Sequence, residues 1–349
     1  MYTQLNLFES PSLPYIQLQT QVSARTTISV IELFAGAGGL ALGMEKAGLK
    51  ANSLIEIDKD AVATLRYNRP NWNVTQADIS KVSYDEISAD VVTGGFPCQA
   101  FSYAGKGLGL EDTRGTLFYE FARCVKEVQP KLFLAENVRG LISHQKGKTF
   151  KYVLSVLESL GYNVQYRLLN AVNYDVPQKR ERVIIIGTRP GIRFQYPAPA
   201  PRIFTLRDAL KDVPPSEGMK YSPKKAAVLA LVPPGGCWRD LPEDIQKSYM
   251  MKSYYLTGGR TGMARRISWD EPSLTLTTSP LQKQTERCHP DETRPFTVRE
   301  YARIQTFSDD WEFMGSIGSK YKQIGNAVPV NFAYHLGRAI VSALSSKLD

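Results

Sequence analysis

The chain contains little cysteine and no long apolar run. Four of its 349 residues are cysteines, and none of them form a C-x-x-C pair, so we expect no zinc or other metal site and no disulfide framework. No stretch of about 18 apolar residues predicts a transmembrane helix, and the first residues lack the basic and apolar regions of a signal peptide. Because free cysteines fit a reducing compartment, we expect a cytoplasmic protein without a membrane partner.

Positive charge and proline are concentrated in one part of the chain. The net charge is +9, which favours an anionic partner. Residues 191–295 hold 16 lysines and arginines against 11 acidic residues, and 13 of the 21 prolines. A basic, irregular segment inside an otherwise regular chain predicts a separate module that contacts nucleic acid.

The first part of the chain has the pattern of a nucleotide-binding α/β unit. An apolar run over 28–34 predicts a strand, and the glycine-rich stretch 35–39 predicts a tight turn before a helix. Glu56 ends the next predicted strand, 51–57, at a spacing that suits the hydroxyls of a ribose. Asp78 follows a third, short strand. The pattern predicts an adenosine-containing cofactor at the carboxyl edge of a sheet, and the absence of a P-loop lysine argues against ATP.

Cys98 follows a short apolar strand at 91–93. Two glycines and then Pro97 precede it, and this arrangement presents a thiol on a rigid turn. A free cysteine is commonly buried and inert, so Cys98 decides nothing by itself. The glycine-rich stretch 102–115 beside it predicts a loop that closes over a site.

Later elements continue the alternation of helix and strand, which is lost between Pro190 and Arg294. The expected elements are helices over 116–128 and 150–160, strands over 131–135, 162–170 and 182–187, a helix over 295–306, a polar turn over 321–329 and a final helix over 330–344. The last helices predict that the chain returns to its first domain.

Five blocks of residues, taken in order, carry a resemblance to a known family. They are Phe34–Gly39, Pro97-Cys98-Gln99, Glu136-Asn137-Val138, Gln178–Arg182 and Gly325–Pro329. In this order they closely resemble the DNA (cytosine-5)-methyltransferases, in particular the single-chain bacterial enzymes of restriction-modification systems. The resemblance runs from about Ile28 to about Leu344 and is weakest in the basic insert.

The resemblance implies an α/β fold: a Rossmann-like S-adenosylmethionine-dependent methyltransferase domain with a small, irregular, β-rich target-recognition domain. The implied division is an N-terminal arm over 1–27, the catalytic domain over 28–189, the target-recognition domain over 190–295, and a segment over 296–349 that returns to the catalytic domain.

The resemblance also implies roles for single residues. Cys98 is expected to attack C6 of cytosine, Glu136 to contact N3 and Arg182 to contact O2. The residues expected to bind S-adenosyl-L-methionine are Phe34, Gly36, Gly38, Gly39, Glu56, Ile57, Asp78, Pro97, Asn326 and Val328. Two positions depart from the family pattern, since Glu32 stands where Asp is usual and Ile57 where many members have an aromatic residue.

The implied reaction is methyl transfer to C5 of a cytosine flipped out of a specific double-stranded DNA sequence, through a covalent Cys98–C6 adduct. The chain is expected to act as a monomer and to protect DNA from a companion restriction endonuclease that it does not bind. The residues expected to contact DNA are Gln99, Ser102, Lys106, Arg114, Arg180, Arg260, Arg265, Arg266, Lys283 and Arg287.

Three other interpretations remain open on the residues alone. Relatives of this family methylate transfer RNA, although Phe96 stands where that branch tends to carry a second proline. A binding protein that keeps the fold without the activity is a second alternative, which intact Cys98, Glu136 and Arg182 disfavour. A nucleotide-dependent oxidoreductase would explain the glycine turn but not the other four blocks.

Overall fold

The computed structural model describes residues 16–17, 27–85, 87–97, 117–256 and 261–345. Within them the chain forms two compact units. Unit 1 comprises residues 1–169, 181–197 and 333–349, and unit 2 comprises residues 170–180 and 198–332. Each unit is described by itself.

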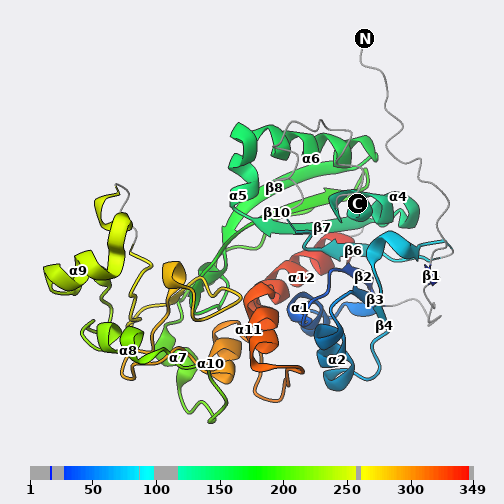
Figure 1. Ribbon diagram of the computed structural model, residues 1–349. Helices are drawn as coiled ribbons and strands as arrows, with labels where there is room; N and C mark the ends of the chain where they lie inside the picture. Colours follow the sequence, from blue (N-terminus) through cyan, green and yellow to red (C-terminus); the bar gives the residue numbers. More distant parts are fainter. Residues whose placement is uncertain (1–15, 18–26, 86, 98–116, 257–260, 346–349) are drawn as a thin grey trace. The chain divides into compact units, whose positions relative to one another are not determined.

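A seven-stranded, mostly parallel sheet forms the centre of unit 1 (Figure 1). The strand order is β4-β3-β2-β6-β7-β10-β8, and β10 runs antiparallel to β7. The strands are β2 Ser29–Leu33, β3 Lys50–Glu56, β4 Val74–Gln76, β6 Val91–Gly94, β7 Leu132–Val138, β8 Asn163–Asn170 and β10 Glu181–Thr188. Two short strands, β1 Ile16–Gln17 and β5 Val82–Ser83, pair separately.

Helices cover both faces of this sheet. Figure 1 shows α1, α2 and α12 on one face and α4, α5 and α6 on the other. These helices are α1 Gly39–Lys46, α2 Lys59–Asn68, α4 Leu117–Val128, α5 Gly140–Ser143, α6 Lys148–Ser159 and α12 Val330–Ser345. The three-layer arrangement confirms the predicted α/β fold.

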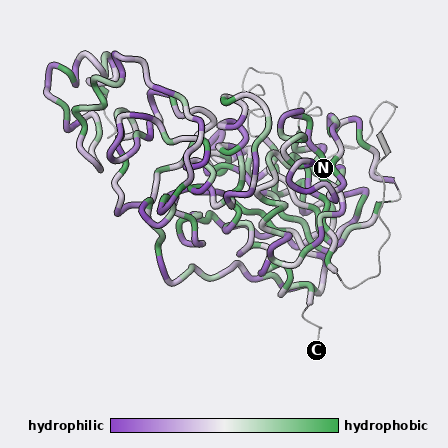
Figure 2. The backbone as a smooth tube through the Cα atoms, turned by 90° about the horizontal axis from the view of Figure 1, so that it is seen from below, coloured by the Kyte–Doolittle hydropathy of each residue, from purple (hydrophilic) through white to green (hydrophobic). Residues whose placement is uncertain are grey.

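The core of unit 1 explains why these segments form strands and helices. Fully buried side chains of α4 and α6, such as Phe121 and Val153, pack on buried residues of the strands, such as Ile31, Val92 and Phe133. Buried apolar area of this kind is the main stabilising contribution to a fold. In Figure 2 the hydrophobic stretches of the backbone are coloured green and the hydrophilic ones purple, and green stretches are frequent among the packed strands and helices of this core.

Unit 2 is built mainly from short helices. Its α-helices are α7 Leu206–Leu210, α8 Pro223–Leu229, α9 Glu243–Met250, α10 Val298–Ile304 and α11 Ile317–Asn326. Its 3-10 turns are η5 Ala171–Asn173, η6 Trp238–Asp240, η7 Met251–Tyr255 and η8 Lys283–Thr285, and its two-stranded sheet pairs β9 Gln178–Lys179 with β11 Ser273–Leu274. The described part of unit 2 is therefore irregular, as expected, but it is not β-rich. Side-chain caps start several of these helices, and proline, which lacks an N–H group, is poorly suited to a sheet.

Two segments near functional blocks differ from the expected elements. Residues 321–326, predicted as part of a polar turn, lie in α11, which starts at Ile317 and is capped by Ser316. Glu136, expected just after a strand, lies inside β7, because β7 stays paired with β10 as far as Val138.

Candidate functional site

The turn after β2 bends sharply through left-handed backbone. Phe34, Gly36 and Gly38 all have positive φ angles, of 59°, 54° and 86°. Glycine adopts this conformation without a steric penalty, whereas Phe34 is strained there. Gly38 is also the N-cap of α1 and carries no side-chain cap, and Gly39 is the first residue of that helix. The backbone N of Gly38 donates to the oxygen of Ala35 at 3.0 Å and holds the turn, and the start of α1 without a side-chain cap is of the kind that binds a polar ligand.

Glu56 ties this turn to the end of β3. Its Oε2 accepts a hydrogen bond from the backbone N of Gly36 at 2.8 Å. Its Oε1 accepts from the backbone N of Ile57 at 2.9 Å and of Asp58 at 2.8 Å. The three bonds orient the carboxylate at the carboxyl edge of the sheet, where ligands of open α/β sheets bind.

Two further predicted cofactor residues follow strands at the same edge. Ile57 directly follows β3, and 64% of it is exposed, which is unusual for an isoleucine. Asp78 follows β4, and its Oδ1 accepts from the backbone N and the hydroxyl of Ser80 at 3.0 and 2.8 Å. The sequence therefore located the polar and apolar groups of this edge correctly, while their cofactor roles stay a prediction.

Glu32, to which sequence reasoning assigned no role, lies buried beneath this turn. Only 3% of the residue is exposed, and its Oε2 has no hydrogen-bond partner among the described residues. Burial raises the pKa of Glu32 well above its usual value, and the nearby charge of Glu56 raises it further. A buried polar atom without a partner fits a site that a polar ligand completes.

Glu136 and Arg182 form a nearly buried ion pair between β7 and β10. Nε of Arg182 lies 2.7 Å from Oε1 of Glu136, and the two side chains are 12% and 13% exposed. A Cβ atom built on Gly95 would lie 3.1 Å from Oε2 of Glu136. Glycine thus allows the carboxylate to approach the chain that leads from β6 toward Cys98.

Asn137 connects the same two segments. Its side chain is buried, and its Nδ2 donates to the backbone oxygen of Phe96 at 2.8 Å. The stretch Gly95–Pro97 is thereby held beside β7. The structure brings Glu136, Arg182 and this stretch together, while Cys98 lies outside the described residues.

The other three cysteines are poor candidates for a nucleophile. Cys124, Cys237 and Cys288 are buried free thiols. Burial raises the pKa of Cys124 and raises that of Cys288 to about 11. Because the thiolate is the reactive form, such thiols react slowly at neutral pH.

Asn326 and Val328 belong to unit 2, at the end of α11 and just after it. Nε2 of Gln305 donates to the backbone oxygens of Ile324 and Ala327 at 2.7 and 3.1 Å, which fixes the backbone around Asn326. Their expected role at a cofactor stays a prediction.

Three of the arginines expected to contact DNA are buried, and this corrects that expectation. Arg180 is 2% exposed and donates to the backbone oxygens of Gly325 and Leu276 at 3.0 and 3.3 Å. Arg287 is 5% exposed, and burial lowers its pKa to about 10. Arg266 is 4% exposed. Its guanidinium donates to the backbone oxygens of Leu229, Val232, His289, Pro290 and Glu292 and to the hydroxyl of Thr293. The guanidinium groups of Arg180 and Arg266 join distant segments of unit 2, and all three arginines are too buried to bind phosphates.

The remaining expected DNA contacts are either partly accessible or lie outside the described residues. Arg265 pairs with Glu271 at 3.3 Å, and its side chain is 17% exposed. Nζ of Lys283 donates to the backbone oxygen of Tyr249 and lies 4.4 Å from the centre of its ring. Gln99, Ser102, Lys106, Arg114 and Arg260 lie outside the described residues, as does the predicted closing loop 102–115.

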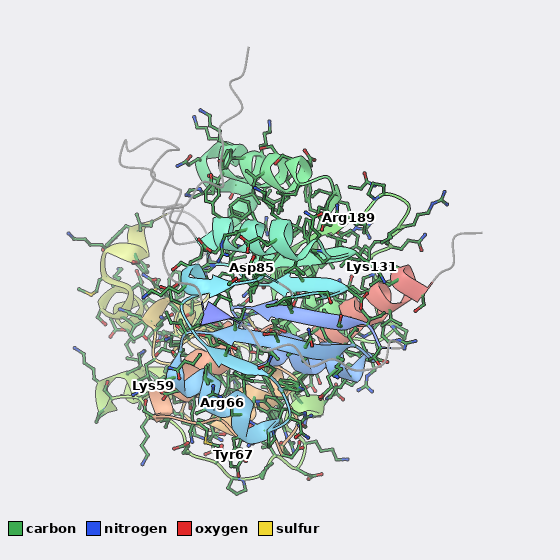
Figure 3. The ribbon with its side chains drawn as sticks, turned by 90° about the vertical axis from the view of Figure 1, so that its right-hand side faces the viewer. Lys59, Arg66, Tyr67, Asp85, Lys131 and Arg189 are labelled. Atoms are coloured by element: carbon green, nitrogen blue, oxygen red, sulfur yellow. The ribbon has the colours of Figure 1, made fainter. Side chains whose placement is uncertain are left out.

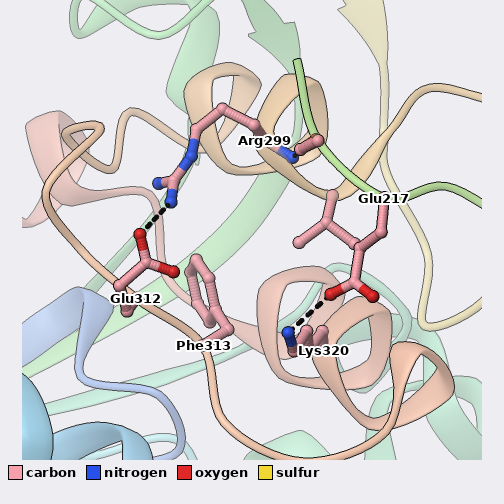
Figure 4. A pocket seen from close by; sticks show the side chains of 7 residues that line it. Glu217, Arg299, Glu312, Phe313 and Lys320 are labelled. Carbon is pink, nitrogen blue, oxygen red and sulfur yellow. Dashed lines mark hydrogen bonds and ion pairs between the residues drawn. The ribbon is translucent and has the colours of Figure 1, made fainter. Parts of the chain in front are cut away.

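A pocket of about 250 Å³ lies within unit 2 (Figure 4). Its lining includes two ion pairs, between Arg299 and Glu312 at 3.0 Å and between Lys320 and Glu217 at 2.5 Å. It contains none of the predicted site residues, and each charge already has an opposite partner. The pocket therefore adds nothing to the candidate site.

The described residues offer neither a metal site nor a membrane-spanning helix. They contain no group of three or more His, Cys, Asp and Glu side chains that could hold a metal ion. None of the helices in the described ranges is long and apolar enough to cross a membrane.

The layered sheet, the glycine turn and the oriented Glu56 define an open-sheet α/β protein with a Rossmann-like fold. Solved structures with the same fold include a DNA modification methyltransferase encoded within a prophage (E. coli), with a TM-score of 0.68, 24% identity, and coverage of 92% of this chain and 100% of that one. The S. pombe Dnmt2 methyltransferase has a TM-score of 0.61 at 18% identity, over 92% of this chain and 100% of that chain.

Sequence comparison narrows this class to one family. The model of the C-5 cytosine-specific DNA methylases matches residues 28–342. The Type II methyltransferase M.Eco47II of Escherichia coli is 59% identical over 340 residues, which cover 93% of this chain and 81% of that protein. M.Sau96I of Staphylococcus aureus is 56% identical over 328 residues, or 91% of this chain and 76% of that protein. The chain belongs to the C-5 cytosine-specific DNA methylases and is a DNA (cytosine-5-)-methyltransferase of the bacterial restriction-modification type.

Proposed function

We propose that the chain transfers a methyl group from S-adenosyl-L-methionine to C5 of a cytosine within a specific double-stranded DNA sequence, through a bond between Cys98 and C6. The observation that carries this proposal is the Glu136–Arg182 pair, held at 2.7 Å beside the Gly95–Pro97 stretch that leads to Cys98. An acid, a cation and a thiol are the groups that this reaction requires.

The chemistry explains why each group is needed. Cytosine C5 is a weak nucleophile, and addition of a thiolate to C6 raises the electron density at C5. Negative charge then develops on the ring, and Glu136 in its acid form donates a proton toward N3. Nε of Arg182 lies 2.7 Å from Oε1 of Glu136, and we assign Arg182 to O2 of the same ring. After transfer, the C5 proton leaves to a base, and the C6–S bond breaks to release the thiolate.

The residues at the carboxyl edge of the sheet fit the cofactor. When bound, S-adenosyl-L-methionine supplies the electrophilic methyl group. The Glu56 carboxylate is oriented to bind ribose hydroxyls, Ile57 offers an exposed apolar surface to the adenine, and Asp78 offers an acceptor for its amino group. Phe34, Gly36, Gly38 and Gly39 supply the bent backbone beside them. For Pro97, Asn326 and Val328 we keep the cofactor roles that the family resemblance implies.

The target base lies inside the duplex, so it must be flipped out before reaction. We assign recognition of the DNA to the basic, proline-rich insert, residues 190–295, and catalysis to residues 28–189 with the returning segment 296–349. A monomer in the cytoplasm that protects DNA from a companion endonuclease is the corresponding cellular role.

Bisulfite sequencing of DNA and RNA from cells that express the protein tests this proposal. We expect methylcytosine at one defined duplex sequence in cells with the wild type and none in cells with Cys98→Ser, whose purified protein still binds S-adenosyl-L-methionine. Methylation of RNA alone would replace DNA as the substrate, and normal methylation by Cys98→Ser would exclude Cys98 as the nucleophile.

A further inference from the structure

The carboxylate of Glu286 joins the two ends of a loop in unit 2, residues 250–263. Glu286 is fully buried, and its Oε1 accepts from the hydroxyl of Tyr249 at 2.6 Å and lies 2.7 Å from Nζ of Lys225. Its Oε2 accepts from the backbone N of Ala264 at 2.5 Å. Tyr249 and Ala264 flank residues 250–263, so one side chain ties the two ends of this loop together.

The backbone at the base of the loop is packed closely. Ala264 has a φ of 45°, a left-handed conformation that costs energy for a residue with a Cβ atom. A Cβ atom built on Gly262 would lie 2.8 Å from the backbone oxygen of Gln284, so this position has no room for a side chain. A buried charge with few partners is costly. The ends of the loop therefore stay together only while the three groups bound to Glu286 remain in place.

The described residues of the loop expose large apolar side chains. The exposed fractions are 66% for Met251, 76% for Tyr255 and 56% for Leu256. The ring of Tyr255 packs edge-on against that of Tyr254, with centres 5.2 Å apart. Several exposed apolar groups on a rigid base indicate a binding surface.

Basic residues accompany these apolar groups. Lys252 is exposed within η7, and Nζ of Lys283 lies over the ring of Tyr249 at the base of the loop. The insert that contains the loop carries an excess of five positive charges, 16 against 11. Cations interleaved with rings and aliphatic groups match duplex DNA, which offers phosphates together with base edges and methyl groups.

We propose that Tyr255 and Leu256 contact base edges of duplex DNA and thereby set the preference for at least one base pair of the methylated sequence, and that Glu286 is the positioning residue for this contact. This inference rests on the proposed function, because it names the part of unit 2 that reads the DNA. Apolar contact with a thymine methyl group is the interaction that these side chains offer.

The test compares purified full-length variants on a randomised pool of DNA duplexes, with bisulfite sequencing of the products. The wild type is measured first, and failure to methylate any duplex contradicts the proposed function itself. With an active wild type, we expect the double variant Tyr255→Ala/Leu256→Ala to lose about tenfold in kcat/KM on the wild-type sequence and to relax one position.

Leu231→Ala is the matched control, because Leu231 is an exposed leucine of unit 2 outside the loop, at 51% exposure. We expect it to keep the wild-type rate and sequence profile. If the double variant also keeps both, the loop does not read DNA and the inference is overturned.

Tyr249→Phe and Glu286→Gln test the positioning role. Both are expected to raise KM for DNA severalfold and to relax the same position as the loop variants, with the dissociation constant for S-adenosyl-L-methionine unchanged. A merely structural role would lower stability without moving the sequence profile. Tyr249→Phe removes only one hydroxyl, so this variant tests the positioning role if Glu286→Gln fails to fold. A sequence profile and a KM equal to those of the wild type would exclude the positioning role of Glu286.

Discussion

At the scale of single residues, Glu136 is the proposed proton donor to N3 of the target cytosine. Glu136→Gln keeps the shape of the side chain and an oxygen for Arg182 but has no acidic proton for N3. We expect turnover to fall by about 100-fold or more, since general acid catalysis contributes that much. Single-turnover transfer of a labelled methyl group to duplex DNA measures this rate.

Tyr67→Ala serves as the control for that experiment. Tyr67 lies on α2 and points away from the sheet (Figure 3), with 63% of the residue exposed. Its replacement should leave turnover unchanged. A Glu136→Gln rate equal to that of Tyr67→Ala would remove Glu136 from the mechanism.

Glu32 leads to a prediction about pH and stability without a cofactor. Its pKa in the folded chain is raised well above 4.5, so the unfolded chain ionises first as the pH rises. The stability associated with the protonated form is therefore complete below the unfolded pKa and is lost as the pH rises toward the folded pKa. Glu32→Gln does not ionise, so we expect the free energy of unfolding of the wild type to fall relative to that of Glu32→Gln as the pH rises above 4.5.

Denaturant titrations of both proteins at several pH values measure this difference. Asp60→Asn is a suitable control, because Asp60 lies in the first turn of α2, away from the buried carboxyl. A difference between Glu32→Gln and the wild type that stays constant with pH would contradict the raised pKa.

At the scale of elements, the bond from Asn137 to Phe96 joins β7 to the stretch that leads from β6 to Cys98. Asn137→Ala removes the donor at 2.8 Å and leaves the buried oxygen of Phe96 without it. We expect a loss of about 1–3 kcal/mol in the free energy of unfolding and a larger fall in kcat than in affinity for the cofactor. Equal kcat for Asn137→Ala and the wild type would show that this bond does not position the nucleophile.

The elements also show how far the sequence could be interpreted. The strands β2, β3 and β6 were predictable because each contains an apolar stretch, and a glycine or an acidic residue lies at its end or shortly after it. The extension of β7 to Val138 was not, because it depends on pairing with β10, which lies more than 40 residues later in the chain. Residues 321–326 were predicted as part of a turn because they are largely polar and include Gly325, whereas they form the last six residues of α11.

The buried arginines were the main failure of sequence reasoning about the site. Arg180, Arg266 and Arg287 are basic residues in or beside a basic insert, and such residues are usually exposed. Their burial depends on backbone oxygens brought together by the folding of unit 2. In contrast, the places of Glu56 and Glu136 near the carboxyl ends of β3 and β7 follow from the α/β pattern, although Glu136 lies two residues inside its strand.

At the scale of the whole molecule, Arg266 tests how unit 2 is held together. Arg266→Met keeps the aliphatic part of the side chain but leaves six acceptors without their donor, and the bonds to four of them are buried. We expect a loss of about 3–5 kcal/mol in the free energy of unfolding. Arg202→Met should cost less than about 1 kcal/mol, because the Arg202–Asp208 pair is exposed. Denaturant titration compares the two, and equal losses would contradict the role of Arg266.

The central claim is that Cys98 bonds to C6 of the target cytosine. A duplex with 5-fluorocytosine at the methylated position tests it directly, because the fluorine cannot leave as the C5 proton does and the C6–S bond then persists. With S-adenosyl-L-methionine present, mass spectrometry of the digested complex should find the nucleotide attached to the peptide that contains Cys98, and no adduct with Cys98→Ser. An adduct on Cys124, Cys237 or Cys288, or wild-type protein that methylates the normal duplex but never becomes attached to the fluorinated one, would contradict the account.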